Sequence, residues 1–139
     1  MPDLEIIQRH ISARIDGLAR LQRHSNATAE QAKRDPDLLW ILERGIYLVI
    51  QNLLDMLAHI ASSDFKGVWA SYSDIGDIFQ RHEIISEEDK NLLNKMAIYR
   101  NMLSHEYFSL DSGILLDIVN NHLSDFTKFQ LIIMDYCKL

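Results

Sequence analysis

Hydrophobic residues recur along the chain every three or four positions, which is the spacing of one face of an α-helix. The first stripe predicts a helix over residues 3–32, with Arg and Gln on its other side. This stripe consists of Leu4, Ile7, Ile11, Ile15, Leu18 and Leu21. Asp35-Pro36-Asp37 then ends the pattern, because proline suits the first turn of a new helix better than the interior of an old one.

The second predicted helix, residues 37–62, is apolar almost all round, as expected of the most buried element of a bundle. A single polar seam follows this helix, and its members lie within about 80° of one another at the helical repeat. The seam consists of Arg44, Gln51, Asp55, His59 and Ser62. Residues 63–71 are expected to be a connection, and residues 72–82 a short helix.

The last two predicted helices have clear N-terminal signals. Ser86 precedes three acidic residues and is suited to cap a helix, whose inward stripe is Leu92, Met96, Tyr99 and Leu103. Asp111 is expected to cap the final helix. The stripe of that helix is Leu115, Ile118, His122, Phe126, Phe129, Ile133 and Tyr136. No strand-like alternation of useful length occurs, so we expect an all-α antiparallel four-helix bundle with one additional short helix.

Length and composition are those of one globular domain covering residues 1–139, with 47% apolar and 24% charged residues. The one cysteine, Cys137, cannot form an internal disulfide, so nothing requires an oxidising compartment. The longest unbroken apolar runs, Leu38–Leu42 and Ile46–Ile50, predict neither a signal peptide nor a membrane span. We therefore expect a soluble, cytoplasmic protein that does not bind a membrane.

The net charge of −6 argues against a surface that binds nucleic acid by bulk electrostatics, and no DNA partner is expected. The charge is unevenly distributed, however: residues 1–34 carry six Arg or Lys against four acidic residues. A locally basic face therefore remains open as a hypothesis.

Several enzyme signatures do not occur in the sequence: a glycine-rich phosphate loop, GxSxG, HExxH, or a Cys/His cluster with zinc spacing. Metal-dependent and NTP-hydrolysing enzymes are therefore poor fits, and neither a cofactor nor a metal site is expected. The densest polar segment lies at the end of the fourth predicted helix. It reads Tyr99-Arg100-Asn101-Met102-Leu103-Ser104-His105-Glu106-Tyr107.

This segment resembles the Arg-Asn-x-x-x-His-x-Tyr signature of HEPN domains, and in particular of the HepT-like toxins that are paired with a minimal nucleotidyltransferase antitoxin. The resemblance extends over nearly the whole chain. Similar sequences carry like residues at Glu43-Arg44, Asp55, His59, Ser71-Tyr72 and Asp111. Ser104 is one departure, because a β-branched aliphatic residue is common there.

The resemblance implies a metal-independent endoribonuclease, and the residue types are suited to that chemistry. RNA cleavage without a metal needs a base near pKa 7 for the 2′-hydroxyl and a fixed cation for the phosphate, which His105 and Arg100 would supply. Asn101 would orient the imidazole or bind the phosphate, and Tyr107 would donate a hydroxyl. On an ideal helix Arg100 and His105 differ by about 140°. A homodimer with two such faces across a twofold axis would therefore bring two sets together, as the resemblance also implies.

Each assignment has a structural alternative. Arg100 and His105 can belong to a solvated helix face. Asp55 and His59, four residues apart, either line the cleft or form a buried carboxylate–histidine hydrogen bond, and the second interpretation is favoured. Arg44 either contacts phosphate or pairs with a carboxylate. The other histidines are expected to be structural or exposed: His10, His24, His82 and His122.

For the whole protein, the first hypothesis is a toxin ribonuclease with RNA as substrate and a cognate nucleotidyltransferase antitoxin as partner. In similar toxins the partner is taken to transfer nucleotidyl groups to the tyrosine of the signature, which is Tyr107 here. The alternatives are a non-catalytic binding or regulatory subunit of a nucleotidyltransferase, and a bundle that only dimerises. The intact Arg100 and His105 favour the ribonuclease.

Overall fold

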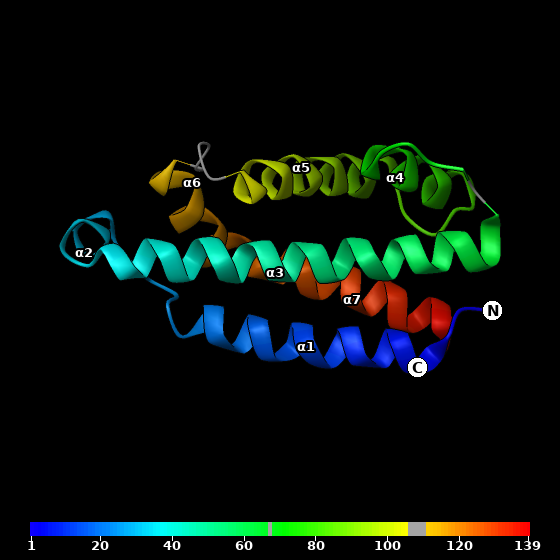
Figure 1. Cartoon of the computed structure of the whole chain (residues 1–139), viewed down its shortest axis with the longest axis horizontal. Coiled ribbons are helices and arrows are strands. Elements are labelled where there is room, and N and C mark those ends of the chain that lie inside the picture. The colour runs from blue at the N-terminus through cyan, green and yellow to red at the C-terminus, as the bar shows by residue number, and fades with distance from the viewer. Residues whose placement is uncertain (67, 106–110) are drawn as a thin grey trace.

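The central helix, α3 (Pro36–Ile60), carries ten of the buried side chains. The computed structural model describes residues 1–66, 68–105 and 111–139, and all regular structure in these ranges is helical. Figure 1 shows α3 between α5 (Glu87–Ser104) and α1 (Leu4–Gln22), with α7 (Leu123–Cys137) packed behind. Helices α1 and α5 run opposite to α3 and α7, which confirms the predicted antiparallel four-helix bundle.

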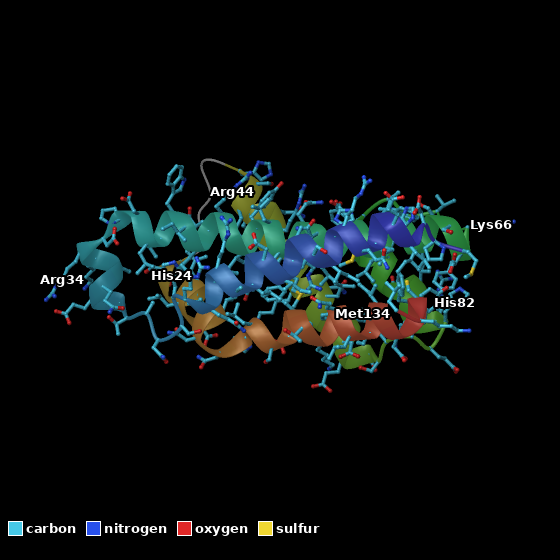
Figure 2. All side chains as sticks on the ribbon, turned by 90° about the horizontal axis from the view of Figure 1, so that it is seen from below. His24, Arg34, Arg44, Lys66, His82 and Met134 are labelled. Carbon is cyan, nitrogen blue, oxygen red and sulfur yellow. The ribbon has the colours of Figure 1, made fainter. Side chains whose placement is uncertain are left out.

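Shorter elements connect the four long helices. They are α2 (Ala29–Arg34), the π-helical segment Ala61–Phe65, α4 (Tyr72–Arg81), α6 (Ser112–Asp117) and the π-helical segment Ile118–His122. Lys66 and His82 lie at one end of the bundle, and Arg34 lies at the opposite end (Figure 2). The predicted short helix is confirmed as α4, and α2 and α6 are two further short helices in the described ranges.

The predicted helix over residues 3–32 was wrong in its length, because the chain turns after Gln22 and begins α2 at Ala29. Asn26 has φ 73°, a left-handed conformation that asparagine tolerates and a continuous helix excludes. Thr28 and Gln31 form a capping box, in which each side chain accepts a hydrogen bond from the other residue's backbone N–H. This Thr-x-x-Gln signal starts a new helix.

The predicted final helix is interrupted, since residues Ile118–His122 are π-helical and separate α6 from α7. Asn120 in this segment reaches the turn after α1: its Oδ1 accepts from the Asn26 N–H at 2.7 Å, and its Nδ2 donates to the Ala27 carbonyl at 2.9 Å. The two irregular segments therefore satisfy each other's polar groups. The predicted cap at Asp111 is confirmed, because its side chain accepts from the Gly113 N–H.

The core stripes differ from the prediction in detail. In α1 the inward residues are Ile7, Ile11, Arg14, Leu18 and Leu21, while Leu4 and Ile15 are exposed. In α5, Leu93, Met96 and Ala97 are buried, and the predicted Leu92, Tyr99 and Leu103 are half-buried at its edge. The predicted inward His122 is exposed and lies between Asp117 and Asp125. Four of the six predicted α1 residues and Met96 of α5 are buried as predicted, so the shift by one position concerns only Ile15, replaced by Arg14, and Leu92, replaced by Leu93. The packing of the neighbouring helices decides these local differences.

The helical segment Pro36–Phe65 is long and apolar enough to span a membrane by length and composition. The buried core helix of a soluble bundle has the same length and composition. Half of the most apolar window is buried inside the molecule. The central position of α3 accounts for this composition.

Candidate active site

Arg100 is held at the centre of a polar network between α5 and α3. Its Nε donates to Oε1 of Gln51 at 2.5 Å, and Gln51 Nε2 donates to Oδ1 of Asp55 at 2.7 Å. Gln51 and Asp55 are one turn apart in the polar seam of α3, so this part of the seam faces Arg100. The hydrogen bond at Nε fixes the plane of the guanidinium group.

Two tyrosine rings flank the Arg100 guanidinium, with its carbon 5.6 Å from the Tyr47 centroid and 5.7 Å from the Tyr72 centroid. Tyr72 is the first residue of α4, and its hydroxyl lies 3.4 Å from Gln51 Nε2. These cation–π contacts hold the cation in place without neutralising it. No acceptor in the described part of the chain bonds Nη2, which leaves this N–H group available to a ligand.

Arg44 adds a second cation to this network. Its guanidinium carbon lies 5.7 Å from the centroid of Tyr47, so Tyr47 is shared by Arg44 and Arg100. Arg44 is exposed on α3 and is labelled in Figure 2. Residues 1–66, 68–105 and 111–139 provide no carboxylate within ion-pair distance of Arg44, so of its two alternatives the carboxylate pair is not observed.

Helix α5 ends at this network. Asn101 Oδ1 accepts from Arg100 Nη1 at 3.1 Å, and Ser104 Oγ donates to the Asn101 carbonyl at 2.9 Å. Ser104 is the last helical residue, and its hydroxyl occupies one of the carbonyls that a helix end leaves unpaired. Ser104, which stands where a β-branched aliphatic residue is common in similar sequences, thus has a local structural role at the helix end.

His105 lies immediately after the helix, exposed, with an extended backbone at φ −100° and ψ 125°. The predicted separation of about 140° from Arg100 was therefore wrong, because it assumed that His105 continued the helix. Its side chain leaves α5 at the same end as the Arg100 network. Tyr107, the expected modification site, lies outside the described residues.

Asp55 and His59 do not form the favoured carboxylate–histidine pair. Asp55 accepts from Gln51, whereas His59 Nε2 accepts from the Asp3 backbone N–H at 3.0 Å and so caps the start of α1 against α3. Asp55 therefore supports the Arg100 network, and His59 does not. The other histidines are structural or exposed as predicted: His10 contacts Asn52, His82 stacks on Phe65, and His122 contacts two aspartates.

Tyr47 and Tyr72 were missed as site residues, and Gln51 was recognised only as part of the seam. One signal was present in the sequence: Tyr47, Gln51 and Asp55 follow each other by four residues and share one face of α3. In the described ranges no group of three or more His, Cys, Asp or Glu side chains could hold a metal ion. The site has the composition of a cationic phosphate-binding surface at a helix end that His105 follows directly.

Residues 14–131 match the family model Ribonuclease HepT-like. The chain belongs to the HepT-like ribonuclease family. The putative RNase YutE of Bacillus subtilis (strain 168) is 31% identical over 90 residues, which cover 63% of this HepT-like chain and 62% of the relative. The mRNA nuclease HepT of Shewanella oneidensis is 29% identical over 76 residues, 55% and 57% of the two chains. The matched part thus spans about three fifths of these curated relatives.

Solved structures resemble this HepT-like chain over almost its whole length. The tri-AMPylated HEPN toxin of Shewanella oneidensis, in complex with MNT antitoxin, has a TM-score of 0.84 and 25% identity, covering 97% of this chain and 99% of that one. Bacillus subtilis YutE, a cytosolic protein of unknown function, has a TM-score of 0.79 and 24% identity, covering 99% and 92%. The second likeness concerns the fold alone.

Proposed function

We propose that this protein is the toxin of a toxin–antitoxin pair and acts as a metal-independent endoribonuclease in the cytoplasm. The observation that carries the proposal is the Arg100 guanidinium, held by Gln51 and two tyrosine rings, next to a helix end that presents His105. A fixed cation beside an imidazole provides the two functions that cleavage at a 2′-hydroxyl needs. The names of two relatives, a putative RNase and an mRNA nuclease, support it.

In the proposed reaction His105 takes the proton of the 2′-hydroxyl, and the 2′-oxygen attacks the adjacent phosphorus. The bond from phosphorus to the 5′-oxygen breaks, and that oxygen takes a proton from the protonated imidazole or from water. The products are a 2′,3′-cyclic phosphate and a 5′-hydroxyl. Arg100 Nη2 and the Asn101 amide would stabilise the charge that develops on the phosphate, and Arg44 would bind a neighbouring phosphate.

The test uses purified protein and RNA in the presence of a chelator. His105→Ala and Arg100→Ala should each lower the cleavage rate at least about 100-fold, the usual effect of removing a general base or an electrostatic group. His122→Ala, which removes an exposed histidine of the π-helical segment before α7, is the matched control and should keep full activity. Full activity of the His105/Arg100 double alanine variant, or loss of cleavage in the chelator, would overturn the proposal.

We further propose that a cognate nucleotidyltransferase restrains the toxin by modifying Tyr107. The phenol oxygen would attack the α-phosphorus of ATP, pyrophosphate would leave, and the phenol proton would pass to solvent. One added phosphodiester charge about 5 Å from an RNA phosphate repels it by roughly 3 kcal/mol at an effective dielectric near 20, or about 100-fold in binding. The tri-AMPylated state of the similar Shewanella toxin supports this proposal.

Peptide mapping by mass spectrometry, after co-expression with the partner, tests the modification. An adduct on Tyr107 and loss of neutralisation in an active Tyr107→Phe variant are expected. An adduct at another residue, or full neutralisation of Tyr107→Phe, would instead support inhibition by occlusion.

A non-catalytic subunit of a nucleotidyltransferase is the second candidate, and the net charge of −6 favours it because an acidic surface is poorly suited to RNA. The chelator assay distinguishes the two. A protein that binds the nucleotidyltransferase but leaves RNA intact at every concentration would have the second function.

A further inference from the structure

A pocket of about 720 Å³ lies where the start of α4 meets the C-terminal half of α5. This volume is within the range of about 300–1,000 Å³ that small-molecule sites occupy. Its lining includes aromatic rings, amides and aliphatic side chains, among them Trp69, Tyr72, Asn94, Ile98 and Asn101.

The pocket opens directly beside Arg100. Asn101 accepts a hydrogen bond from Arg100, and the Tyr72 ring lies 5.7 Å from the Arg100 guanidinium carbon. Asn94, Ile98 and Asn101 follow at four- and three-residue spacing, so they form one stripe of α5 that leads toward the helix end before His105. A molecule in the pocket would therefore lie next to a phosphate bound at Arg100.

The apolar part of the lining is suited to a flat aromatic ligand. Trp69 and Tyr72 are half-buried, so their rings are held by packing while part of each remains accessible. Ile98 also lines the pocket and is 58% exposed, so its apolar side chain is accessible to a ligand. Nucleobases stack on such surfaces in proteins that bind single-stranded RNA.

The polar part of the lining presents hydrogen-bond donors. Asn101 Oδ1 is occupied by Arg100, and the Nδ2 group carries two hydrogens, one for the phosphate and one for a ligand in the pocket. Asn94 Oδ1 is buried with no partner in the described part of the chain, and it lies 3.5 Å from the position of a Cβ on Gly76, against α4. Asn94 Nδ2 makes no hydrogen bond among the described residues and, unlike Oδ1, is not a fully buried atom, so it is the other available donor.

We infer that this pocket binds one nucleobase of the RNA strand next to the scissile phosphate and favours guanine over adenine. Guanine presents two neighbouring acceptors, O6 and N7, to the two amide donors, whereas adenine presents one acceptor and the N6 donor. This inference rests on the proposed function, which identifies the bound strand as RNA. A base could also come from a nucleotidyl group on Tyr107, and that base would be adenine. A preference for guanine therefore distinguishes an RNA base from the base of the modification.

Tryptophan fluorescence tests the pocket directly, because the chain has only two tryptophans and Trp40→Phe leaves Trp69 as the sole reporter. The probes are 2′-O-methyl oligonucleotides, which cannot be cleaved, with guanine, adenine or an abasic site at one position. Guanine should quench Trp69 and bind at least about tenfold more tightly than adenine or the abasic site. Equal dissociation constants for the three probes would overturn the inference.

Variants of α5 provide the matched comparison. Asn94→Asp replaces the proposed donor by an acceptor and should abolish the preference for guanine, whereas Asn91→Asp adds the same charge one turn earlier on the exposed face and should preserve it. An equal effect of the two variants would overturn the inference. Anisotropy of a fluorescein-labelled guanine oligonucleotide measures binding where Trp69 itself is replaced. Trp69→Ala should weaken guanine binding about tenfold or more, and Trp69→Phe, which keeps a ring, should weaken it less.

The binding assay does not depend on cleavage. Failure of the His105→Ala test with retained guanine preference would contradict the ribonuclease and leave the pocket supported. Normal cleavage with no base preference in either assay would contradict the pocket alone. Adenosine monophosphate binding as tightly as guanosine monophosphate in the Trp40→Phe protein would also overturn the preference.

Discussion

Arg100 and Arg14 are both at least partly buried, but only Arg100 keeps an N–H group available to a ligand. Arg100 is half-buried, hydrogen-bonded through Nε and flanked by two rings, with Nη2 left for a ligand. Arg14 is fully buried in α1, and its Nη2 donates to the Phe126 carbonyl while Nε and Nη1 have no partner among the described residues. Burial lowers the pKa of Arg14 to about 10.

Gln51→Leu should lower RNA cleavage about tenfold without unfolding the protein. The substitution removes the acceptor that orients Arg100, so the cation is retained and its position is lost. Cleavage rates of a double-mutant cycle measure the effect: in the Arg100→Ala background, Gln51→Leu should have no further effect. Gln22→Leu, on the exposed end of α1, is the control. Independent, additive losses would show that Gln51 does not act through Arg100.

Arg14→Met should raise the free energy of unfolding by about 1–2 kcal/mol. Methionine keeps the long apolar stem, and removal of a desolvated cation with two unpaired N–H donors eliminates a cost of burial. Chemical denaturation at pH 7 measures the change, with Arg20→Met on the exposed face of α1 as control. A loss of stability would mean that the Phe126 contact outweighs the desolvation.

At the scale of the helices, capping residues determine where each element begins. Ser86 and Asp89 form a capping box at the start of α5, and Asp89 also pairs with Lys128 of α7 at 2.5 Å. Burial alone would raise the pKa of Asp89, but the hydrogen bonds from Lys128 and Ser86 outweigh it, and the pKa is lowered. One carboxylate thus begins α5 and fastens it to α7.

Asp89→Asn should cost about 1–3 kcal/mol at pH 7, the effect of losing a hydrogen-bonded charge at a buried position. Because the pKa of Asp89 is lower in the folded than in the unfolded state, its contribution is present above pH 4. That contribution should disappear as the pH falls below about 4 and through the folded-state pKa. Urea denaturation between pH 7 and pH 3 should show the free energies of unfolding of wild type and Asp89→Asn converging.

The control is Asp16→Asn, at an exposed pair with Arg20, which should cost less than about 1 kcal/mol at pH 7. A constant difference between wild type and Asp89→Asn at all pH values would exclude the ionic contribution.

At the scale of the whole molecule, α3, α4 and α5 supply the residues of the candidate site. Helices α1 and α7 pack on the other side of α3 and complete the core. Large apolar side chains remain exposed on α3, including Trp40 at 72% and Leu48 at 42%, and Ile98 is exposed on α5. A small bundle with this much uncovered apolar surface is suited to self-association.

We expect a homodimer whose twofold axis passes near α5, so that two Arg100 and His105 sets share one cleft. Sedimentation at micromolar concentration should show a dimer, and specific activity should fall on dilution below the dissociation constant. Ile98→Asp, on the exposed face of α5, should produce monomers in sedimentation. Because Ile98 also lines the pocket between α4 and α5, the activity of this variant does not report on dimerisation alone. A monomer with undiminished activity at every concentration would contradict the expectation.

Local signals in the sequence determined the fold class and the proposed catalytic residues. Helix periodicity, the cap at Ser86, the proline at the start of α3 and the Arg100/His105 signature each depend on residues within one or two turns of each other. These features are therefore visible without any knowledge of packing. The capping box of Thr28 is a local signal of the same kind. It was missed because the hydrophobic stripe before it predicted one continuous helix.

Only the tertiary structure decided how the helices are rotated and what surrounds Arg100. The inward position of Arg14, the bonds between Asn120 and the turn after α1, and the meeting of Gln51, Tyr72 and Arg100 join residues that are far apart in the chain. Such contacts depend on the rotation and register of packed helices. Rotation and register follow from the fit of all side chains in the core, and no single segment specifies them.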